Sequence, residues 1–585
     1  MTALRDRLQS GRPLLFDGAM GTYFAARYGE GRCELADLDR SEAVRAIHRA
    51  YLDAGCEAIR TNTFSVSADL AGGEEDLSRS LIQAGCRLAL ETAAPYGAYV
   101  FADIGPAPEG KALDRGAVYS RQAELFLDQG ITCFLAETLP SDEGIADLAA
   151  ELKARCPEAF LLVSFAVGHD GVTREGLAGG ELLRRTAAIP GVDAVGFNCV
   201  SGPQHLLEYI QTLDLTGITL SVMPNAGYPT VLGRRIAFQG TPTYFGQKIS
   251  QIGAAGAAIV GGCCGTTPDH IARAAEALAR PPVQAPPRPR VTTQRREEPE
   301  EGPFSRKLRQ GERVIAVELD PPPDDDGTAF LAGVRALRAA GADAVTIADC
   351  PVGRPRADSS ILACKLKREL GVEPLPHLTC RDRNLNATKA LLLGLSMEGV
   401  HNVLLVTGDP IPTENRDEVK GVFNFNSRKL ARYVAGLNET VLKTPFRIFG
   451  ALNVNARNFE IQLRMACEKE ACGVDGFLTQ PVLSPEALEN LELARATLKG
   501  KLLGGIYPPV SHRNACFLNN EIAGIRVSEE ILSLYEGKDR QEAEDLAVEL
   551  AVRIASDIAP YTDGLYLMTP FQRIGLMTRI LSRVR

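Results

Sequence analysis

Short apolar runs alternate with amphipathic helical stretches along the whole chain, and this alternation restricts the fold more than any other feature of the sequence. In the first half the apolar runs are RPLLFDGAM, CEAIRTNTF, YVFADIGP, CFLAETL, FLLVSFAV, AVGFNC, TLSVMPNAG and AAIVGGCC. In the second half they are RVIAVELDP, DAVTIADC, LPHLTC, NVLLVTGDP, FRIFGALNV, GFLTQPV, LLGGIYPP and DGLYLMTP. Strands separated by helices are typical of parallel βαβ units, and eight such units close into a (β/α)8 barrel. The pattern therefore predicts an α/β protein made of two consecutive TIM barrels.

A proline-rich and charged segment separates the two sets of strands. Residues 281–302 read PPVQAPPRPRVTTQRREEPEEG, which offers almost nothing apolar to bury. Because proline favours extended geometry, this segment is expected to be a semi-rigid linker. We expect one barrel at 1–280, the linker at 281–304 and a second barrel at 305–585, since each half has the size that one barrel needs.

The composition excludes several classes of function. Hydrophobic residues make up 45% and charged residues 23% of the chain, as in globular proteins. The net charge of -9 offers no basic surface for nucleic acid. No apolar run approaches the roughly 18 residues of a membrane span, and the N-terminus lacks an apolar signal region, so we expect a cytoplasmic protein without a membrane partner. The 14 cysteines lack the spacing of a secreted scaffold and are expected to be reduced, while the oligomeric state, a homo-oligomer included, stays open.

Three cysteines stand at predicted strand ends in the first half. Cys199 ends AVGFNC, and Cys263 and Cys264 follow AAIVGG, so in a closed barrel all three reach the same mouth. The adjacent pair serves one site only if the backbone bends there, which the neighbouring glycines allow. Three thiolates suit a catalytic zinc site with one open position. The alternative is that they pack as small hydrophobic side chains. After them, Thr267 is expected to cap a helix that begins at Pro268.

Acids stand at two strand ends in the second half. Glu318 ends RVIAVE and Asp409 follows NVLLVTG, so either could act as a general acid or electrostatic group if burial shifts its pKa. The alternative is that both acids cap loops and that His377 is a core histidine bonded to a carbonyl. No GxGxxG or GxxxxGK[ST] stretch occurs, so a Rossmann or P-loop nucleotide site has no support.

The first half resembles the zinc-dependent homocysteine S-methyltransferases over nearly all of residues 1–280. The resemblance rests on DGAMGT at 17–22, TNTF at 61–64, AETL at 136–139, GFNC at 196–199, PNAG at 224–227 and GGCCGT at 261–266. It implies that Cys199, Cys263 and Cys264 are the zinc ligands and that Asp17 and Glu137 hold the amino group of homocysteine. It also implies that Asn62 and Asn225 lie near the site. From the residues alone, Asp17 is equally a turn residue, Glu137 a helix-start acid and either asparagine a loop cap.

The second half resembles methylenetetrahydrofolate reductase over most of residues 312–585. The motifs, in order, are VELDPP, PHLTCRDRN, VTGDP, GFLTQPV and VSHRNACFLNNEIAGI. The resemblance implies FAD, reduction by NADH or NADPH, and 5,10-methylenetetrahydrofolate as substrate. Glu318 is then the general acid that helps open the folate ring, Asp409 stabilises cationic character at the pterin or tunes the flavin, and Gln480 binds the pterin. The positions that match flavin contacts are Thr346, His377, Thr379, Gly408, Asp409 and Lys469.

The second half also departs from its family. Many single-domain reductases have arginine where this chain has Thr407, and acids are common where it has Asn424 and Asn426. These differences concern the phosphate and ribose of the flavin more than the folate acids. The first half has AET where its family more often has FET, a change that leaves Glu137 in place.

Together the two resemblances imply a bifunctional one-carbon enzyme that makes 5-methyltetrahydrofolate in one barrel and methionine in the other. The alternative is a zinc methyltransferase whose second barrel only binds folate or serves assembly. For the methyl donor, the sequence favours a sulfonium compound, because the N5 methyl of the folate sits on a poor leaving group and no DxHxxG stretch offers a cobalamin histidine.

Overall fold

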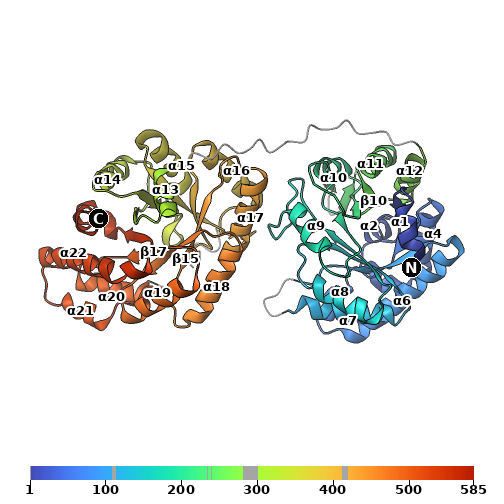
Figure 1. Ribbon diagram of the computed structural model, residues 1–585, viewed down its shortest axis with the longest axis horizontal. Helices are drawn as coiled ribbons and strands as arrows, with labels where there is room; N and C mark the ends of the chain where they lie inside the picture. The colour runs from blue at the N-terminus through green and yellow to red at the C-terminus, as the bar shows by residue number, and fades with distance from the viewer. Residues whose placement is uncertain are drawn as a thin grey trace. The chain divides into compact units, whose positions relative to one another are not determined.

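The chain folds into two compact units, Met1–Arg295 and Arg296–Arg585, and each is considered by itself (Figure 1). The computed structural model describes residues 2–108, 113–232, 235–238, 240–280, 301–411, 419–522 and 524–585. Residues 281–300, most of the predicted linker, lie outside the described residues.

The first unit contains an eight-stranded parallel sheet that closes on itself. Its strands are β1 (Leu14–Leu15), β2 (Ala58–Arg60), β3 (Tyr99–Ile104), β4 (Cys133–Leu139), β5 (Phe160–Phe165), β6 (Ala194–Asn198), β7 (Leu220–Met223) and β10 (Ala257–Val260). The sheet order is β1-β10-β7-β6-β5-β4-β3-β2, and a parallel bridge between Phe16 and Ala58 joins its two ends. All eight predicted strands are present, so the barrel prediction is confirmed. A hairpin of β8 (Pro229–Leu232) and β9 (Arg235–Phe238) was not predicted.

Helices alternate with these strands as the sequence pattern requires (Figure 1). They are α1 (Thr2–Gln9), α2 (Gly21–Tyr28), α3 (Ala36–Asp39), α4 (Ser41–Asp53), α5 (Val66–Ala71), α6 (Glu75–Ala93), α7 (Arg115–Leu127), α8 (Ile145–Arg155), α9 (Gly179–Ala187), α10 (Pro203–Ile210), α11 (Pro242–Ala254) and α12 (Pro268–Leu278). Helix α12 begins as predicted, with Pro268 in its first turn and a capping box between Thr267 and His270.

The interior of the first barrel changes from apolar to polar toward the carboxyl ends of its strands. Ala58, Phe101 and Leu135 belong to an apolar cluster that fills the lower interior. Side chains two residues apart on a strand point to the same face, so Arg60, Asp103 and Glu137 lie one step above them. A layer of ionisable side chains therefore lies at the base of the barrel mouth, where TIM barrels carry their active sites.

The second unit is a closed parallel barrel of eight strands in sequential order. Its strands are β11 (Val314–Glu318), β12 (Ala344–Ile347), β13 (Glu373–Thr379), β14 (Asn402–Val406), β15 (Arg447–Leu452), β16 (Gly476–Pro481), β17 (Lys501–Ile506) and β18 (Gly564–Met568). Its helices are α13 (Pro303–Gln310), α14 (Thr328–Ala339), α15 (Ser359–Lys365), α16 (Leu385–Met397), α17 (Ser427–Thr440), α18 (Phe459–Ala471), α19 (Pro485–Thr497), α20 (His512–Glu521), α21 (Glu529–Leu534), α22 (Arg540–Asp557) and α23 (Ile574–Val584). Phe304 and Leu308 of α13 pack with the apolar interior of the strands. All eight predicted strands of this half are again present.

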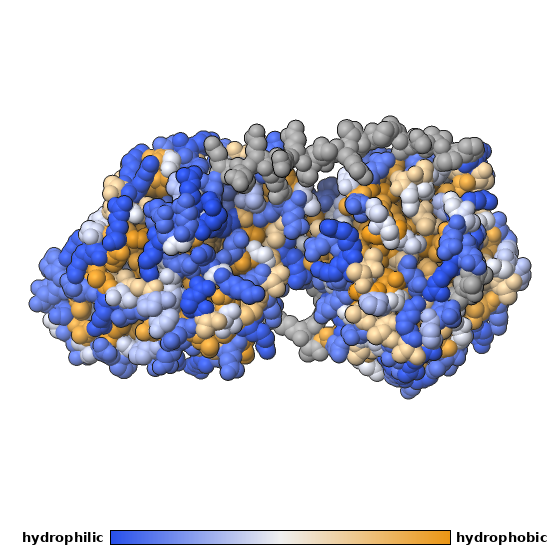
Figure 2. All heavy atoms as spheres, in the orientation of Figure 1, coloured by the Kyte–Doolittle hydropathy of each residue, from blue (hydrophilic) through white to orange (hydrophobic). Residues whose placement is uncertain are grey.

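Hydrophilic and hydrophobic side chains are interspersed over each unit on the face drawn in Figure 2. Such mixing is normal for a protein surface that contacts water. Within the described part of the chain, every helix is too short or too polar to cross a bilayer.

Candidate active sites of the two barrels

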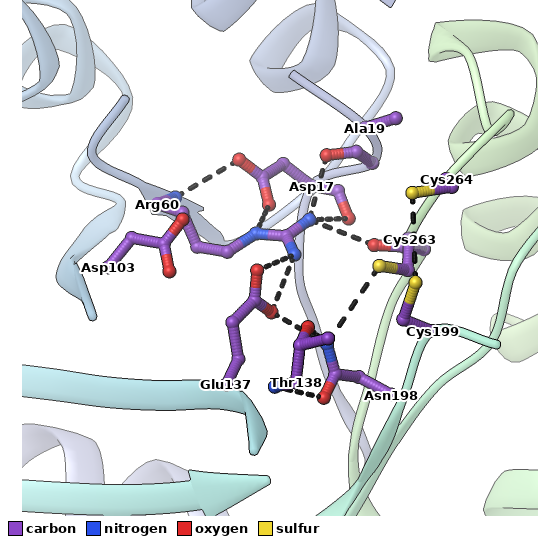
Figure 3. A network of polar contacts seen from close by, with 12 residues as sticks. Asp17, Ala19, Arg60, Asp103, Glu137, Thr138, Asn198, Cys199, Cys263 and Cys264 are labelled. Carbon is purple, nitrogen blue, oxygen red and sulfur yellow. Dashed lines mark hydrogen bonds and ion pairs between the residues drawn. The ribbon is translucent and has the colours of Figure 1, made fainter. Parts of the chain in front are cut away.

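The three cysteines at strand ends of the first barrel come together in the structure (Figure 3). Cys199 follows β6, while Cys263 and Cys264 follow β10, and their sulfur atoms all lie within 4.8 Å of one another. The sulfurs of Cys199 and Cys264 are 3.7 Å apart. Cys199 has a left-handed backbone, with φ of 57°, and Gly265 turns the chain after the cysteine pair with φ of 77°. These bends let adjacent residues face one site.

The sulfur positions fit a zinc ion. Tetrahedral coordination with Zn–S bonds of about 2.3 Å places neighbouring sulfurs about 3.8 Å apart. The 3.7 Å separation between Cys199 and Cys264 is close to that spacing. Cys199 and Cys264 are half-buried and Cys263 is buried, so the cluster has both a dry inner wall and an approach from the mouth.

A buried arginine stands between the two acids that were predicted to hold an amino group (Figure 3). Arg60 Nε donates to Asp17 Oδ1 at 2.9 Å, and Arg60 Nη1 donates to Glu137 Oε2 at 3.0 Å. Burial raises the pKa of Asp17, although the charge of Arg60 opposes that rise. Neither acid is a turn or helix-start residue alone, because Glu137 lies inside β4 and Asp17 binds across to β2.

Sequence reasoning missed Arg60, Asp103 and Asn198. Asn198 donates from Nδ2 to Glu137 Oε2 at 3.1 Å. Asp103 lies 6% exposed, and its Oδ1 has no hydrogen-bond partner among the described residues. Burial, and then the charge of Glu137, raises the pKa of Asp103 well above its ordinary value. The only sequence signal for Asp103 was its place three residues before the end of YVFADIGP.

The two predicted asparagines differ in their surroundings. Asn62 donates from Nδ2 to the Cys33 carbonyl at 2.8 Å and to Asp37 Oδ1 at 2.9 Å, so its amide supports the local fold. Asn225 is 3% exposed, and its Oδ1 has no hydrogen-bond partner among the described residues. Its free acceptor makes Asn225 the better candidate for a ligand contact.

In the second barrel, Glu318 meets a tyrosine and a histidine. The hydroxyl of Tyr566, on β18, donates to Glu318 Oε2, and His377 Nε2 lies 3.7 Å from the same oxygen. Burial raises the pKa of Glu318 to about 7, although its side chain stays 22% exposed. Burial also lowers the pKa of His377 to about 4, so the pair is a neutral imidazole beside a carboxyl group and not an ion pair. His377 Nε2 has no hydrogen-bond partner among the described residues.

The remaining predicted flavin contacts lie on separate elements of this barrel. Thr346 lies fully buried on β12. Thr379 donates from Oγ1 to Asp349 Oδ2 at 2.9 Å. Lys469 donates from Nζ to the Ala451 carbonyl at 2.7 Å, and burial lowers its pKa to about 8.

Asp409 and Gln480 occupy different environments. Asp409 is exposed, and its Oδ2 accepts the Val352 N–H at 2.8 Å. This contact holds a loop, as the interpretation of Asp409 as a loop-capping residue predicts. This contact leaves its other oxygen available. Gln480 is half-buried on β16.

One feature of the site suits a bound cofactor, because His377 presents a buried nitrogen that has no hydrogen-bond partner among the described residues. Gly408 has φ of 95°, and a Cβ there would lie only 3.1 Å from Thr379 Cβ. A larger residue than glycine would crowd this position.

The residues that depart from the reductase pattern have local roles. Asn424 Oδ1 accepts the Leu385 N–H at 2.8 Å. Asn426 caps α17 by accepting the N–H groups of Arg428 and Lys429. Thr407 is exposed at the start of the loop that follows β14. The two asparagines therefore bind nearby backbone N–H groups. This structural role accounts for an amide side chain at each position, with no flavin contact required.

Known proteins resemble each half separately. Residues 14–278 match the family model described as Homocysteine S-methyltransferase, and residues 304–585 match Methylenetetrahydrofolate reductase. The methionine synthase of Mycobacterium tuberculosis is 32% identical over 307 residues, which cover 48% of this chain and 25% of that protein. The homocysteine S-methyltransferase of Escherichia coli is 30% identical over 312 residues, covering 46% of this chain and 96% of that protein.

The chain thus spans about a quarter of the length of the methionine synthase and nearly all of the E. coli protein. Among solved structures, the metallated homocysteine methyltransferase MmuM of E. coli is similar, with 26% identity, a TM-score of 0.39, and coverage of 47% of this chain and 99% of that one. Through its first barrel, which covers nearly all of the E. coli sequence at 30% identity, the chain belongs to the homocysteine S-methyltransferase family, while its second barrel matches the family model of methylenetetrahydrofolate reductase.

Proposed function

We propose that the first barrel transfers a methyl group to homocysteine at a zinc ion held by Cys199, Cys263 and Cys264. The convergence of the three thiols within 4.8 Å carries this proposal. A zinc ion held there would lower the pKa of a bound thiol, so that the thiol would be a nucleophilic thiolate at neutral pH. A carboxylate beside the thiols holds the amino group of the substrate. Because the ligands must be reduced, a reducing compartment such as the cytoplasm suits the protein.

The test is methionine formation by the purified protein with zinc removed and restored. Activity with homocysteine and S-methylmethionine should disappear with a chelator and return with one equivalent of zinc. Full activity in metal-free protein would disprove the zinc role.

We further propose that the methyl donor is a sulfonium compound such as S-methylmethionine or S-adenosylmethionine. A sulfonium sulfur leaves readily, whereas the N5 atom of 5-methyltetrahydrofolate leaves poorly unless it is protonated. In the absence of cobalamin and sulfonium compounds, we expect labelled 5-methyltetrahydrofolate to yield no labelled methionine above background. Labelled methionine formed at a catalytic rate would contradict this proposal and would favour transfer of the folate methyl to homocysteine.

For the second barrel we propose reduction of 5,10-methylenetetrahydrofolate to 5-methyltetrahydrofolate by NADH or NADPH through FAD. Glu318 carries this proposal, because a carboxyl group with a pKa of about 7 can donate a proton at neutral pH. FAD would supply hydride transfer, with His377, Thr379, Gly408 and Lys469 along its binding surface. Glu318 protonates the folate amine as the ring opens, while the neutral imidazole of His377 leaves that proton on the acid. Gln480 orients the pterin, and Asp409 stabilises its cationic character.

Colour separates this proposal from a barrel that only binds folate. Protein reconstituted with FAD should be yellow, bleach with NADH or NADPH, and regain its colour with methylenetetrahydrofolate. Protein that no added FAD can colour would favour the binding or assembly role.

Tyr566 provides a prediction about pH. Its hydroxyl donates to Glu318 and lowers the pKa of that acid, because the hydrogen bond favours the carboxylate. In Tyr566→Phe we expect the alkaline limb of the folate-reduction profile to move upward by roughly one to two pH units, the value of a hydrogen bond to a charged group. The measurement is the rate of flavin reoxidation by methylenetetrahydrofolate across pH. An unmoved limb would show that Tyr566 does not set the pKa of Glu318.

A further inference from the structure

Arg60 joins four segments at the mouth of the first barrel. Its Nη2 donates to the Gly18 carbonyl at 2.7 Å and to the Gly262 carbonyl at 2.8 Å, in addition to the bonds that Nε and Nη1 make to Asp17 and Glu137. The Arg60 side chain is only 8% exposed. Gly262 directly precedes Cys263, so the guanidinium fixes the start of the loop that carries two of the three thiols.

Asp17 uses both carboxylate oxygens to hold Arg60. Its Oδ1 accepts Arg60 Nε at 2.9 Å, and its Oδ2 accepts the Arg60 backbone N–H at 3.0 Å. The Asp17 carbonyl also accepts the Gly262 N–H at 3.0 Å. Asp17 is therefore bonded to the residue that precedes the cysteine pair both directly and through Arg60.

Glu137 makes its short hydrogen bonds through only one of its two carboxylate oxygens. Its Oε2 accepts Arg60 Nη1 at 3.0 Å and Asn198 Nδ2 at 3.1 Å, while its Oε1 has only a long contact of 3.4 Å with Arg60. Asn198 Nδ2 lies 3.8 Å from Cys263 Sγ, which brings Glu137 to the edge of the thiol cluster. Figure 3 shows the Glu137 carboxylate between the guanidinium and Asn198, and the Asp17 carboxylate on the opposite side of the guanidinium.

The free oxygens divide in the same way. Arg60 pairs with both acids, at 2.9 Å to Asp17 and 3.0 Å to Glu137, but it engages both oxygens of Asp17 and leaves Glu137 Oε1 with only the long contact. A buried charge without a full complement of partners favours a ligand of opposite charge. If the sulfur of an α-amino thiol binds at the cysteine cluster, its ammonium group can lie next to Glu137.

We propose that Arg60 separates the roles of the two acids: Glu137 alone recognises the ammonium group of the thiol substrate, while Asp17 and Arg60 are positioning residues that hold the metal-binding loop. This assignment rests on the proposed function of the first barrel. It differs from an amino-group site shared by both acids, because it makes the two acids separable by experiment.

The test uses the full-length, zinc-loaded protein and two thiols that differ only in the amino group, homocysteine and 4-mercaptobutanoate. Calorimetry gives the Kd of each thiol, and competition with a chromophoric chelator gives zinc affinity. In Glu137→Gln we expect the preference for homocysteine to fall by about 30-fold or more, as for loss of one partner of a buried charge pair, with zinc affinity unchanged. In Asp17→Asn we expect weaker zinc affinity, by about 10- to 100-fold, with the preference for homocysteine retained.

Two further variants complete the test. The double variant Asp17→Asn, Arg60→Lys removes the Asp17 carboxylate and the forked guanidinium but keeps one positive charge beside Glu137, and it serves if Asp17→Asn alone does not fold. It should also lower zinc affinity and keep the preference. Glu175→Gln is the matched control, because Glu175 is a buried acid paired with Arg115 at 3.2 Å in the same barrel. It should change neither quantity.

The outcomes separate this inference from the proposed function. If Asp17→Asn or the double variant loses the amino-group preference as fully as Glu137→Gln does, both acids bind the substrate and the inference is wrong. If Glu137→Gln keeps the preference, the inference is equally wrong. A parent protein that binds neither thiol would overturn the proposed function itself.

Discussion

Replacing Cys264 with serine (Cys264→Ser) is expected to remove most of the zinc and to lower methyl transfer to homocysteine by at least about 100-fold, since even residues that only support a metal ligand contribute 10- to 100-fold. A serine hydroxyl is a poor substitute for a thiolate on zinc. Cys264 is half-buried at the mouth, so the exchange of sulfur for oxygen leaves the apolar interior of the barrel intact. Elemental analysis and methionine formation with a sulfonium donor measure the two effects.

The same variant should leave the second barrel unaffected, because the two barrels are separate compact units. Reduction of methylenetetrahydrofolate is therefore an internal control for folding and concentration. Cys156→Ser is a matched control in the first barrel, since Cys156 is also a half-buried free cysteine but lies at the end of α8, outside the thiol cluster. A full equivalent of zinc in Cys264→Ser would remove Cys264 from the ligand set.

The barrels could be predicted from the sequence because their cause is local. Each strand is a short apolar run and each helix has its own periodicity, so sixteen strands could be found without knowledge of which ones pair. The cysteine cluster followed from the same pattern, since barrel closure brings the ends of β6 and β10 to one mouth. The β8–β9 hairpin escaped this reasoning because it interrupts the regular alternation of strands and helices.

Contacts across the barrel could not be predicted in this way. Arg60 looked like an ordinary strand residue in CEAIRTNTF, and only its inward direction on β2 places it between Asp17 and Glu137. Tyr566 and Glu318 are 248 residues apart in the sequence and meet because β11 and β18 pair where the barrel closes. The resemblance to known families supplied the acids but not the groups that set their charge.

Glu318→Gln should retain FAD and its reduction by NADH or NADPH but reduce methylenetetrahydrofolate about 10²- to 10⁴-fold more slowly, the usual contribution of a general acid. Glutamine keeps the shape of the side chain and can still accept the Tyr566 hydroxyl through its carbonyl oxygen, but it has no acidic proton to deliver. Stopped-flow measurement separates the two half-reactions, flavin bleaching by the nicotinamide and flavin reoxidation by the folate.

The pH dependence of the second half-reaction makes this prediction specific to Glu318. With a pKa of about 7, the parent acid loses its proton as the pH rises through 7, so folate reduction should decline on the alkaline side. In Glu318→Gln the residual rate should lack that decline. Glu373→Gln is the matched control, because Glu373 is a buried acid of the same barrel that pairs with Lys367 at the start of β13, opposite the mouth. It should keep both the rate and the alkaline decline. Folate reduction by Glu318→Gln at the parental rate would instead make Glu318 a loop-capping residue, and the proton would have to come from another group at the mouth.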